Sequence, residues 1–185
     1  LMDTYKTAQL DLARIAVADH NSLRQALQEV SRVTASTMHI GRISIWMFLP
    51  HRQAIRCEYL YQPDQPDAFE GTLLHNQHFT HYFKALQLTQ TVPIADTSNP
   101  AILQEFLECY MKPLHITAML DAPIYRGNQI IGIVCHEQVS ATGDSREWEA
   151  QDTQLAAFTA STVARLYEEA AKQQAELMLS THQSH

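Results

Sequence analysis

Two pairs of adjacent extended segments constrain the fold of this chain more than any other feature. The first pair, at 42–49 and 54–61, is rich in β-branched and aromatic residues and is broken by a short connector. The second pair, at 116–125 and 129–139, is separated by Arg126-Gly127-Asn128. Connectors this short join antiparallel strands. The sequence therefore predicts two β-hairpins that contribute to an antiparallel sheet.

Segments with helical periodicity lie before, between and after the two hairpins. Apolar residues recur at helical spacing weakly over 4–18 and strongly over 22–38, and again over 75–90, 99–112 and 149–178. A short extended piece at 92–96 lies in the middle section. Strands and helices that follow one another in this order predict an α+β fold, with helices packed on an antiparallel sheet. The 185 residues suit one domain with an extension rather than two domains.

Composition excludes several classes of function. Hydrophobic residues make up 45% of the chain, which is enough for a packed core. The net charge of -7 disfavours nucleic acids and anionic membrane surfaces as partners. No apolar run reaches the roughly 18–20 residues of a membrane span, and the N-terminus lacks the order of a signal peptide. Three widely spaced cysteines indicate reduced thiols, so we expect a cytoplasmic location.

Several motifs together resemble one known family. The stretch 120–170 contains a strand with Pro123, a turn with Gly127, Ile-Gly-Ile, Cys-x-Glu at 135–137 and Arg-x-Trp at 146–148. The segments HFTHYFKAL (78–86), VPIAD (92–96) and RISIWMF (42–48) fit the same pattern. Over about residues 20–170 the chain resembles GAF domains, and more narrowly the subgroup found in bacterial sensor histidine kinases and diguanylate cyclases.

The resemblance implies a regulatory module rather than an enzyme. It implies a central antiparallel sheet, with terminal helices on one face and middle helices and loops that roof a small-molecule pocket on the other. It also implies a homodimer formed through the terminal helices, in a two-component or cyclase signalling protein that carries an output domain. We expect an N-terminal helical arm at 1–19, the GAF domain at 20–170 and a helical linker at 171–185. The chain starts at Leu1 and ends in a helical pattern, so we expect a piece of a longer protein.

Aromatic residues and one face of the last strand supply the candidate ligand-binding residues. Because side chains alternate along a strand, Cys135 and Glu137 share a face that is opposite to Gly132 and His136. We assign Gly132 to the helix-covered face, where a glycine lets a helix approach closely, and Cys135 and Glu137 to the pocket. The predicted set is Trp46, Tyr59, Tyr61, Phe79, Tyr82, Phe83, Asp96, Cys135 and Glu137. A core without a pocket is the alternative, and the ligand and any cofactor stay unknown.

Other polar groups suggest chemistry less strongly. Asp121 could pair with Glu137 across two strands, but we expect solvated or edge positions for them. His75, His78 and His81 have a spacing that could place two of them on one helix face as metal ligands, although no metal motif accompanies them, and we predict none. We expect Arg146 and Trp148 to anchor the last helix to the sheet.

Two further alternatives follow from the same residues. Some GAF relatives reduce methionine sulfoxide with cysteines, and only Cys57 and Cys135 could approach each other for such chemistry. Neighbours in a strand point to opposite faces, so Cys135 and His136 cannot form a catalytic dyad. We therefore predict no catalytic residue. The chain could also be a ligand-free dimerisation spacer.

Overall fold

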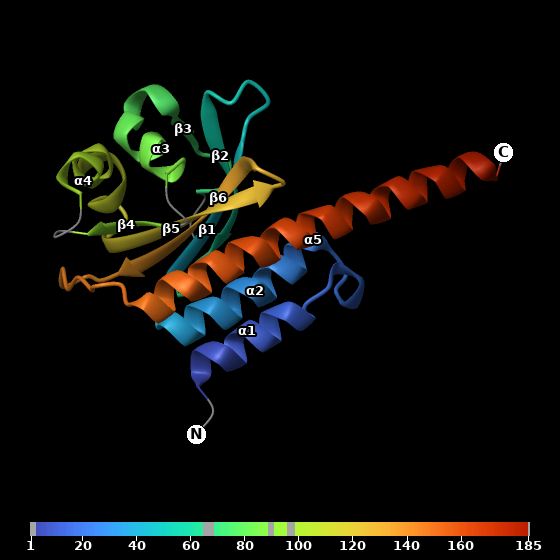
Figure 1. The fold of residues 1–185 in the computed structure, drawn as a ribbon, viewed down its shortest axis with the longest axis horizontal. Coiled ribbons are helices and arrows are strands. Elements are labelled where there is room, and N and C mark those ends of the chain that lie inside the picture. Colours follow the sequence, from blue (N-terminus) through green and yellow to red (C-terminus); the bar gives the residue numbers. More distant parts are fainter. Residues whose placement is uncertain (1–2, 65–68, 89–90, 96–98, 185) are drawn as a thin grey trace.

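The structure is a computed structural model that describes residues 3–64, 69–88, 91–95 and 99–184. It is built on a six-stranded antiparallel sheet in the order β3-β2-β1-β6-β5-β4 (Figure 1). The strands are β1 (Arg42–Phe48), β2 (Ala54–Tyr61), β3 (Leu73–His75), β4 (Val92–Ala95), β5 (Ile116–Arg126) and β6 (Gln129–Val139). Both predicted hairpins are present, and β1 pairs with β6 to join them. The prediction of an α+β fold with a central antiparallel sheet is confirmed.

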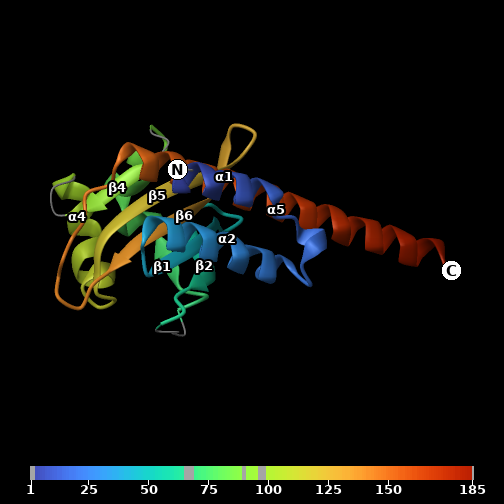
Figure 2. The same ribbon diagram turned by 90° about the horizontal axis from the view of Figure 1, so that it is seen from below.

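Helices cover the two faces of the sheet unequally. Three long helices, α1 (Thr4–Arg14), α2 (Leu23–Met38) and α5 (Ala150–Gln183), lie on one face (Figures 1 and 2). Two short helices, α3 (Thr80–Leu86) and α4 (Pro100–Phe106), lie over the other face, and we call them the roof. A π-helical turn, η3 (Leu107–Met111), follows α4, and 3-10 turns occur at η1 (Val17–Asp19) and η2 (Asn76–His78). This division into terminal and middle helices is the predicted one. No helix in the described part of the chain is long and apolar enough to cross a lipid bilayer.

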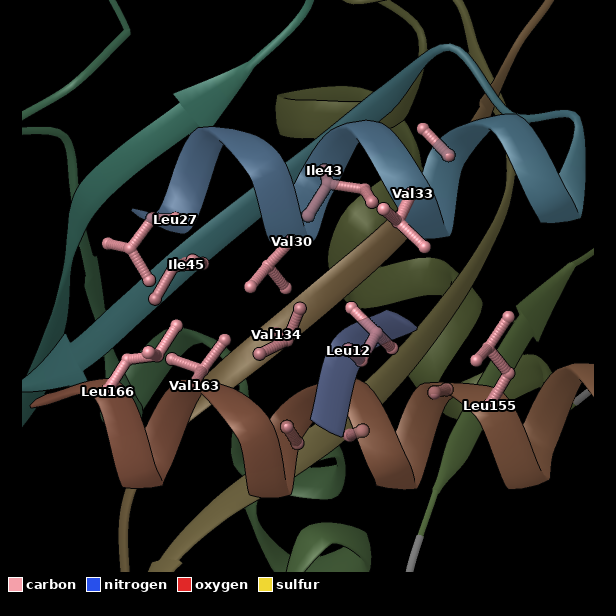
Figure 3. Close-up of a cluster of buried hydrophobic side chains, with 14 of the residues drawn as sticks. Leu12, Leu27, Val30, Val33, Ile43, Ile45, Val134, Leu155, Val163 and Leu166 are labelled. Atoms are coloured by element: carbon pink, nitrogen blue, oxygen red, sulfur yellow. The ribbon is translucent and has the colours of Figure 1, made fainter. Parts of the chain in front are cut away.

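One hydrophobic core lies between the long helices and the sheet. Figure 3 shows side chains of α1, α2 and α5 converging on β1 and β6. The helix residues labelled there are Leu12, Leu27, Val30, Val33, Leu155, Val163 and Leu166, and the strand residues are Ile43, Ile45 and Val134. Burial of this apolar face is what holds the amphipathic helices in place.

Helix α1 is packed into the same core. Leu12 is fully buried, and the hydroxyl of Tyr5 donates to Oδ1 of Asp152 over 2.7 Å. At the other end of α1, Arg165 donates to the carbonyl of Leu12 over 3.2 Å. Residues 4–14 therefore contact α5 through both apolar and polar groups, and the division of the chain at residue 20 stays a prediction.

The middle section differs from the predicted helix over 75–90. Leu73–His75 forms the edge strand β3, which pairs with Ala54–Arg56, and α3 begins only at Thr80. A three-residue strand is too short to show an alternating pattern, so no local pattern predicts it. The three histidines consequently lie in β3, η2 and α3 rather than on one helix.

Gly132 lies on the helix-covered face, yet a strand rather than a helix approaches it. A Cβ atom at this position would lie 2.3 Å from the carbonyl oxygen of Trp46 and 2.6 Å from the sulfur of Met47. The neighbouring strand β1 therefore takes the space that we expected a helix to use.

Arg146 anchors the start of α5 to a helix as well. Its guanidinium donates to the carbonyl of Met38 at the end of α2 over 2.6 Å and to Asp152 over 3.2 Å. It also lies over the ring of Trp148 at 4.5 Å. These contacts join α5 to α2, whereas we expected an attachment to the sheet itself.

Candidate functional site

A row of polar side chains lies on the sheet beneath the roof. It consists of Arg42 and Ser44 in β1, Asp121 in β5, and Cys135 and Glu137 in β6. All five are buried. Strand alternation puts them on the face opposite the long helices, and the β1–β6 register sets Ser44 beside Cys135 and Arg42 beside Glu137. Charged side chains this deeply buried are uncommon in a purely structural core, so this row is the candidate site.

Glu137 is held through one of its two oxygens. The hydroxyl of Ser44 donates to Oε1 over 3.0 Å, and Nε of Arg42 lies 3.4 Å from the same oxygen. The indole N–H of Trp46 donates to Oγ of Ser44 over 2.9 Å, which fixes the hydroxyl. Burial raises the pKa of Glu137, and the charge of Arg42 offsets only part of that effect.

Arg42 has further partners beside the carboxylate. Its Nη1 donates to Oε1 of Gln62 over 2.7 Å, and its guanidinium lies 4.6 Å from the ring centre of Phe69. A planar guanidinium can donate in the plane and stack on an aromatic face at once. Arg42 thus closes one end of the polar row.

Asp121 connects the sheet to the roof. The hydroxyl of Tyr82, in α3, donates to Oδ2 of Asp121. Burial raises the pKa of Asp121 to about 7, with a smaller raising effect from the charge of Glu137, while the bond from Tyr82 lowers it. The pKa of Tyr82 is itself raised well above its ordinary value by burial, so this hydroxyl keeps its proton. Asp121 therefore changes its charge near neutral pH.

The two roof helices are joined by a carboxylate. Glu105 in α4 accepts the backbone N–H of His81 at Oε2 and that of Tyr82 at Oε1, both over 2.9 Å. These N–H groups are at the start of α3, whose N-cap residue forms no side-chain cap. A carboxylate satisfies such free donors and interacts well with the positive end of the helix. The roof therefore behaves as one unit that Tyr82 connects to the sheet.

Three oxygens beneath the roof are buried and lack a hydrogen bond of normal geometry among the described residues, and we call them unpartnered. They are Oδ1 of Asp121, Oε2 of Glu137 and the hydroxyl oxygen of Tyr110 in η3. Weaker contacts of the Tyr110 hydroxyl with Glu137 and of the Cys135 thiol with Asp121 lower the pKa of each carboxyl group. A buried polar atom without a partner costs about 1–3 kcal/mol. Since all three belong to the same side of the sheet, they mark where an additional hydrogen-bonding group would be most favourable.

The structure brings most of the predicted ligand-binding residues to this face. Trp46, Phe79, Tyr82, Phe83 and Cys135 belong to one hydrophobic cluster under the roof, and Glu137 lies on the same side of β6. Rings fill the space between roof and sheet: the centres of Tyr82 and Phe106 are 4.8 Å apart, and those of Trp46 and Tyr110 are 6.3 Å apart.

Tyr59 and Tyr61 lie on the opposite face, with the long helices. A β-bulge interrupts the pairing of β1 and β2, so that Cys57 pairs with Trp46 but Tyr59 pairs with Ile45. One inserted residue reverses which side chains face the roof. Cys57 consequently belongs to the cluster under the roof and Tyr59 to the helix-side core. Asp96, the remaining predicted residue, lies outside the described residues.

Sequence reasoning missed four members of the site. Arg42, Ser44, Tyr110 and Asp121 were not among the predicted ligand-binding residues, and the expected solvated or edge positions of Asp121 and Glu137 were wrong because both are buried. The alternation that places Trp46 under the roof also places Ser44 and Arg42 there. Strand alternation could therefore have identified Arg42 and Ser44, whereas no sequence pattern indicates how deeply Asp121 is buried.

The cysteines are placed poorly for nucleophilic chemistry. Cys57 and Cys135 are buried and free, and burial raises the pKa of Cys57 to about 12 and that of Cys135 well above its ordinary value. Cys109 is exposed and donates to the carbonyl of Glu105 over 3.3 Å. A thiolate is the reactive form, so the two buried thiols are held in the unreactive one.

Metal-ligating groups do not gather in the described part of the chain, where no group of three or more His, Cys, Asp or Glu side chains could hold an ion. The rings of His75 and His78 are 6.5 Å apart, and His81 lies 3.1 Å from Glu105 instead. Surface hollows occur away from the polar row; one of about 280 Å³ lies between β5 and α5 and is lined by Pro123, Tyr125, Ala157, Ser161 and Ala164.

Comparisons with known proteins agree with this geometry. A sequence model of the GAF domain matches residues 22–166. The fold is similar to the phycocyanobilin-bound GAF domain of a cyanobacterial phytochrome, with a TM-score of 0.70, 9% identity, and coverage of 94% of this chain and 98% of that one. No curated protein sequence matches the chain significantly.

Two further solved structures have the same fold. The GAF domain of an Acinetobacter phosphoenolpyruvate-protein phosphotransferase matches with a TM-score of 0.69 and 10% identity over 94% of this chain and 99% of that one. The chromophore-binding domain of a Stigmatella aurantiaca bacteriophytochrome (a threonine-to-histidine mutant) matches with a TM-score of 0.69 and 12% sequence identity. That match covers 89% of this chain and 60% of the other. At these identities the likeness shows the fold alone.

Proposed function

We propose that this chain, which belongs to the GAF domain family, is a regulatory sensor domain that binds a small molecule between its roof and its sheet. GAF domains are commonly small-molecule-binding sensor domains and generally not catalytic. The observation that carries the proposal is the set of three buried, unpartnered oxygens beneath the roof in the described part of the chain. A ligand that bonds to them would recover hydrogen-bond energy that the free domain lacks.

The ligand that we propose is smaller than a bilin. The cyanobacterial neighbour binds phycocyanobilin, but in this chain the rings of Trp46, Tyr82, Phe106 and Tyr110 occupy the space beneath the roof. The roof consists of two seven-residue helices, and we expect a small molecule to enter by displacing them. A tetrapyrrole would require most of this cluster to repack.

We infer that the domain itself is not an enzyme. The methionine-sulfoxide-reductase alternative needs a thiolate, and burial keeps Cys57 and Cys135 protonated. The free thiols suit a reducing compartment, which supports the proposal of a cytoplasmic location.

The same proposal includes a larger signalling protein that acts as a homodimer, such as a two-component kinase or a cyclase. Helix α5 continues beyond the sheet (Figures 1 and 2), and its last turns expose Leu177, Met178 and Leu179. Exposed apolar residues on a projecting helix favour pairing with another helix. A ligand that binds two arrangements of such a pair with different affinity would shift the output domain between two states.

A thermal-shift screen against small metabolites of varied charge tests the ligand proposal. We expect at least one compound to raise the melting temperature, because a ligand of the native state stabilises it. Tyr110→Phe removes an unpartnered hydroxyl and should weaken the shift. Tyr59→Phe is the matched control, since Tyr59 is equally buried on the opposite face. A ligand-free spacer would show no shift with any compound, and equal binding by both variants would contradict this site.

A further inference from the structure

The positions of the three unpartnered oxygens define the chemistry of a ligand. Asp121 pairs with Cys135 and Met119 pairs with Glu137, so the two carboxylates are diagonal neighbours on one face of β5 and β6. Diagonal neighbours in a sheet have Cα atoms about 7–8 Å apart, close enough for one small group to lie between their side chains. Tyr110 approaches from the roof side, where its hydroxyl forms a weak hydrogen bond with Glu137 that raises the pKa of Tyr110 and lowers that of Glu137.

The charges at this position are unbalanced towards the negative. Arg42 lies beside Glu137, but no cation in the described part of the chain forms an ion pair with Asp121. The surroundings are aromatic, since Trp46, Phe106 and Tyr110 lie in ring contact with one another or with Tyr82. Aromatic faces attract cations, and carboxylates that are buried without a counter-ion do so more strongly.

From this arrangement we propose that the ligand carries a protonated primary amine. Its three N–H bonds would be directed at Oδ1 of Asp121, Oε2 of Glu137 and the hydroxyl oxygen of Tyr110. An ammonium group has three donors and no acceptor, which suits three oxygens that accept no hydrogen bond of normal geometry and keep lone pairs for a further donor. The inference rests on the proposed function and specifies the ligand class of the same site.

The same geometry couples ligand binding to proton release. An ammonium binds ionised Asp121, whereas the buried carboxyl of the free domain is half protonated near pH 7. The titratable and charged groups around it are Tyr82 from α3, Tyr110 from η3, Cys135 and Glu137 from β6, and Arg42 from β1. Among these the two tyrosines and the cysteine stay protonated, so they do not titrate in this range. Because only the ionised fraction binds, the apparent affinity should rise about tenfold between pH 6 and pH 8.

Two sets of probes test the ligand class, and within each set an amine, a diol and a carboxylate have the same carbon-chain length but different charges. Titration calorimetry at pH 6 and pH 8 would compare putrescine, 1,4-butanediol and succinate, and likewise ethanolamine, ethylene glycol and glycolate. We expect binding by the amines alone, about tenfold tighter at pH 8, with proton release that appears as a dependence of the heat on the buffer. Binding of a diol or a dicarboxylate in preference to the amine would overturn the inference but leave the proposed function standing. Absence of binding by every probe and by every compound of the screen would overturn both.

The Asp121→Asn variant tests whether Asp121 binds the amine, without loss of the folded structure. Asparagine can still accept the bond from Tyr82, so the variant should fold with at least the stability of the parent chain. It should bind the amine at least tenfold more weakly and lose the pH dependence of binding. Glu168→Gln is the charge-matched control, because Glu168 is exposed on α5 and should change neither quantity. Unchanged amine binding by Asp121→Asn would contradict the inference and would mean that the unpartnered oxygens form hydrogen bonds only with buried water.

Discussion

At the scale of single residues, Gly132 is the position where the sheet leaves no room for a side chain. A Cβ atom there would meet the backbone of β1 at 2.3 Å, and a backbone atom cannot move aside as a flexible side chain can. We expect Gly132→Ala to lower the free energy of unfolding by about 2–3 kcal/mol, measured by urea denaturation. Gly41→Ala is the control, since its nearest contact would be an ordinary 3.5 Å and its cost should stay within about 0.5 kcal/mol. Equal effects of the two substitutions would contradict the packing of β1 against β6.

Asp121 makes stability depend on pH with a sign opposite to that of most carboxylates. Its pKa is about 7 in the folded chain and near 4 when unfolded, so between these values the folded state binds more protons. The contribution of Asp121 to the free energy of unfolding is therefore fully present below about pH 4 and is lost as the pH rises through 7. The total loss is about 4 kcal/mol. Urea denaturation from pH 4 to pH 8 should show that Asp121→Asn gains stability relative to the parent chain as the pH rises. A difference that does not vary with pH would contradict the buried, protonatable state.

His136 has the opposite effect over much of the same range. Its ring is fully buried on the helix side, Nδ1 bonds to the carbonyl of Leu120 over 2.8 Å, and burial lowers its pKa to about 4. Below about pH 6.5 His136 becomes protonated in the unfolded chain but stays neutral in the folded chain. The free energy of unfolding therefore falls by about 3 kcal/mol as the pH decreases to 4. We expect His136→Asn to reduce this acid sensitivity in the same measurement. Replacement of the exposed His182 should leave it unchanged.

The candidate site was predictable only where strand alternation continued without interruption. Alternation placed Cys135 and Glu137 on the roofed face and Gly132 and His136 on the other, as the structure has them. Tyr59 was predicted from its aromatic ring alone, and the bulge in β2, which leaves no regular sequence pattern, places it on the other face. The depth of Asp121 was not predictable either, since burial depends on the roof that covers it.

At the scale of elements, α1 is the helix whose role its sequence reveals least. Its periodicity is weak, yet Leu12 is fully buried while Leu10 on the same helix is 55% exposed. We expect Leu12→Ala to lower the free energy of unfolding by about 2–4 kcal/mol, since it leaves a cavity in the core shared with α2 and α5. Leu10→Ala is the matched control and should cost less than about 0.5 kcal/mol. Equal small effects would mean that α1 is a detachable arm.

The long elements were predictable and the short ones were not. Helix α2 and strands β1, β2, β5 and β6 have enough residues to show a period, and they lie within a few residues of their predicted bounds. Strand β3 and the late start of α3 depend on pairing with β2 and on the cap from Glu105. Both are tertiary contacts, which no local pattern reports.

At the scale of the whole molecule, the projecting end of α5 should determine the oligomeric state. Met178 lies between Leu177 and Leu179, and all three are more than half exposed. We expect the full chain to dimerise at high micromolar concentration in sedimentation velocity, and Met178→Glu to shift it to monomer. Ser180→Glu adds the same charge about 200° around the helix and should leave the dimer intact. A parent chain that stays monomeric throughout would contradict pairing through α5.

The length of α5 has a mechanical consequence for any signal from the sheet. Leu166 is its last fully buried residue, and the stretch from Tyr167 to Gln183 adds about 25 Å at 1.5 Å per residue. A rigid rod of that length works as a lever arm. A tilt of about 10° at the core would displace its far end by about 4 Å, nearly one helical turn. Small repacking around Leu166 would thus appear at the far end of α5 as a movement comparable to the size of a side chain.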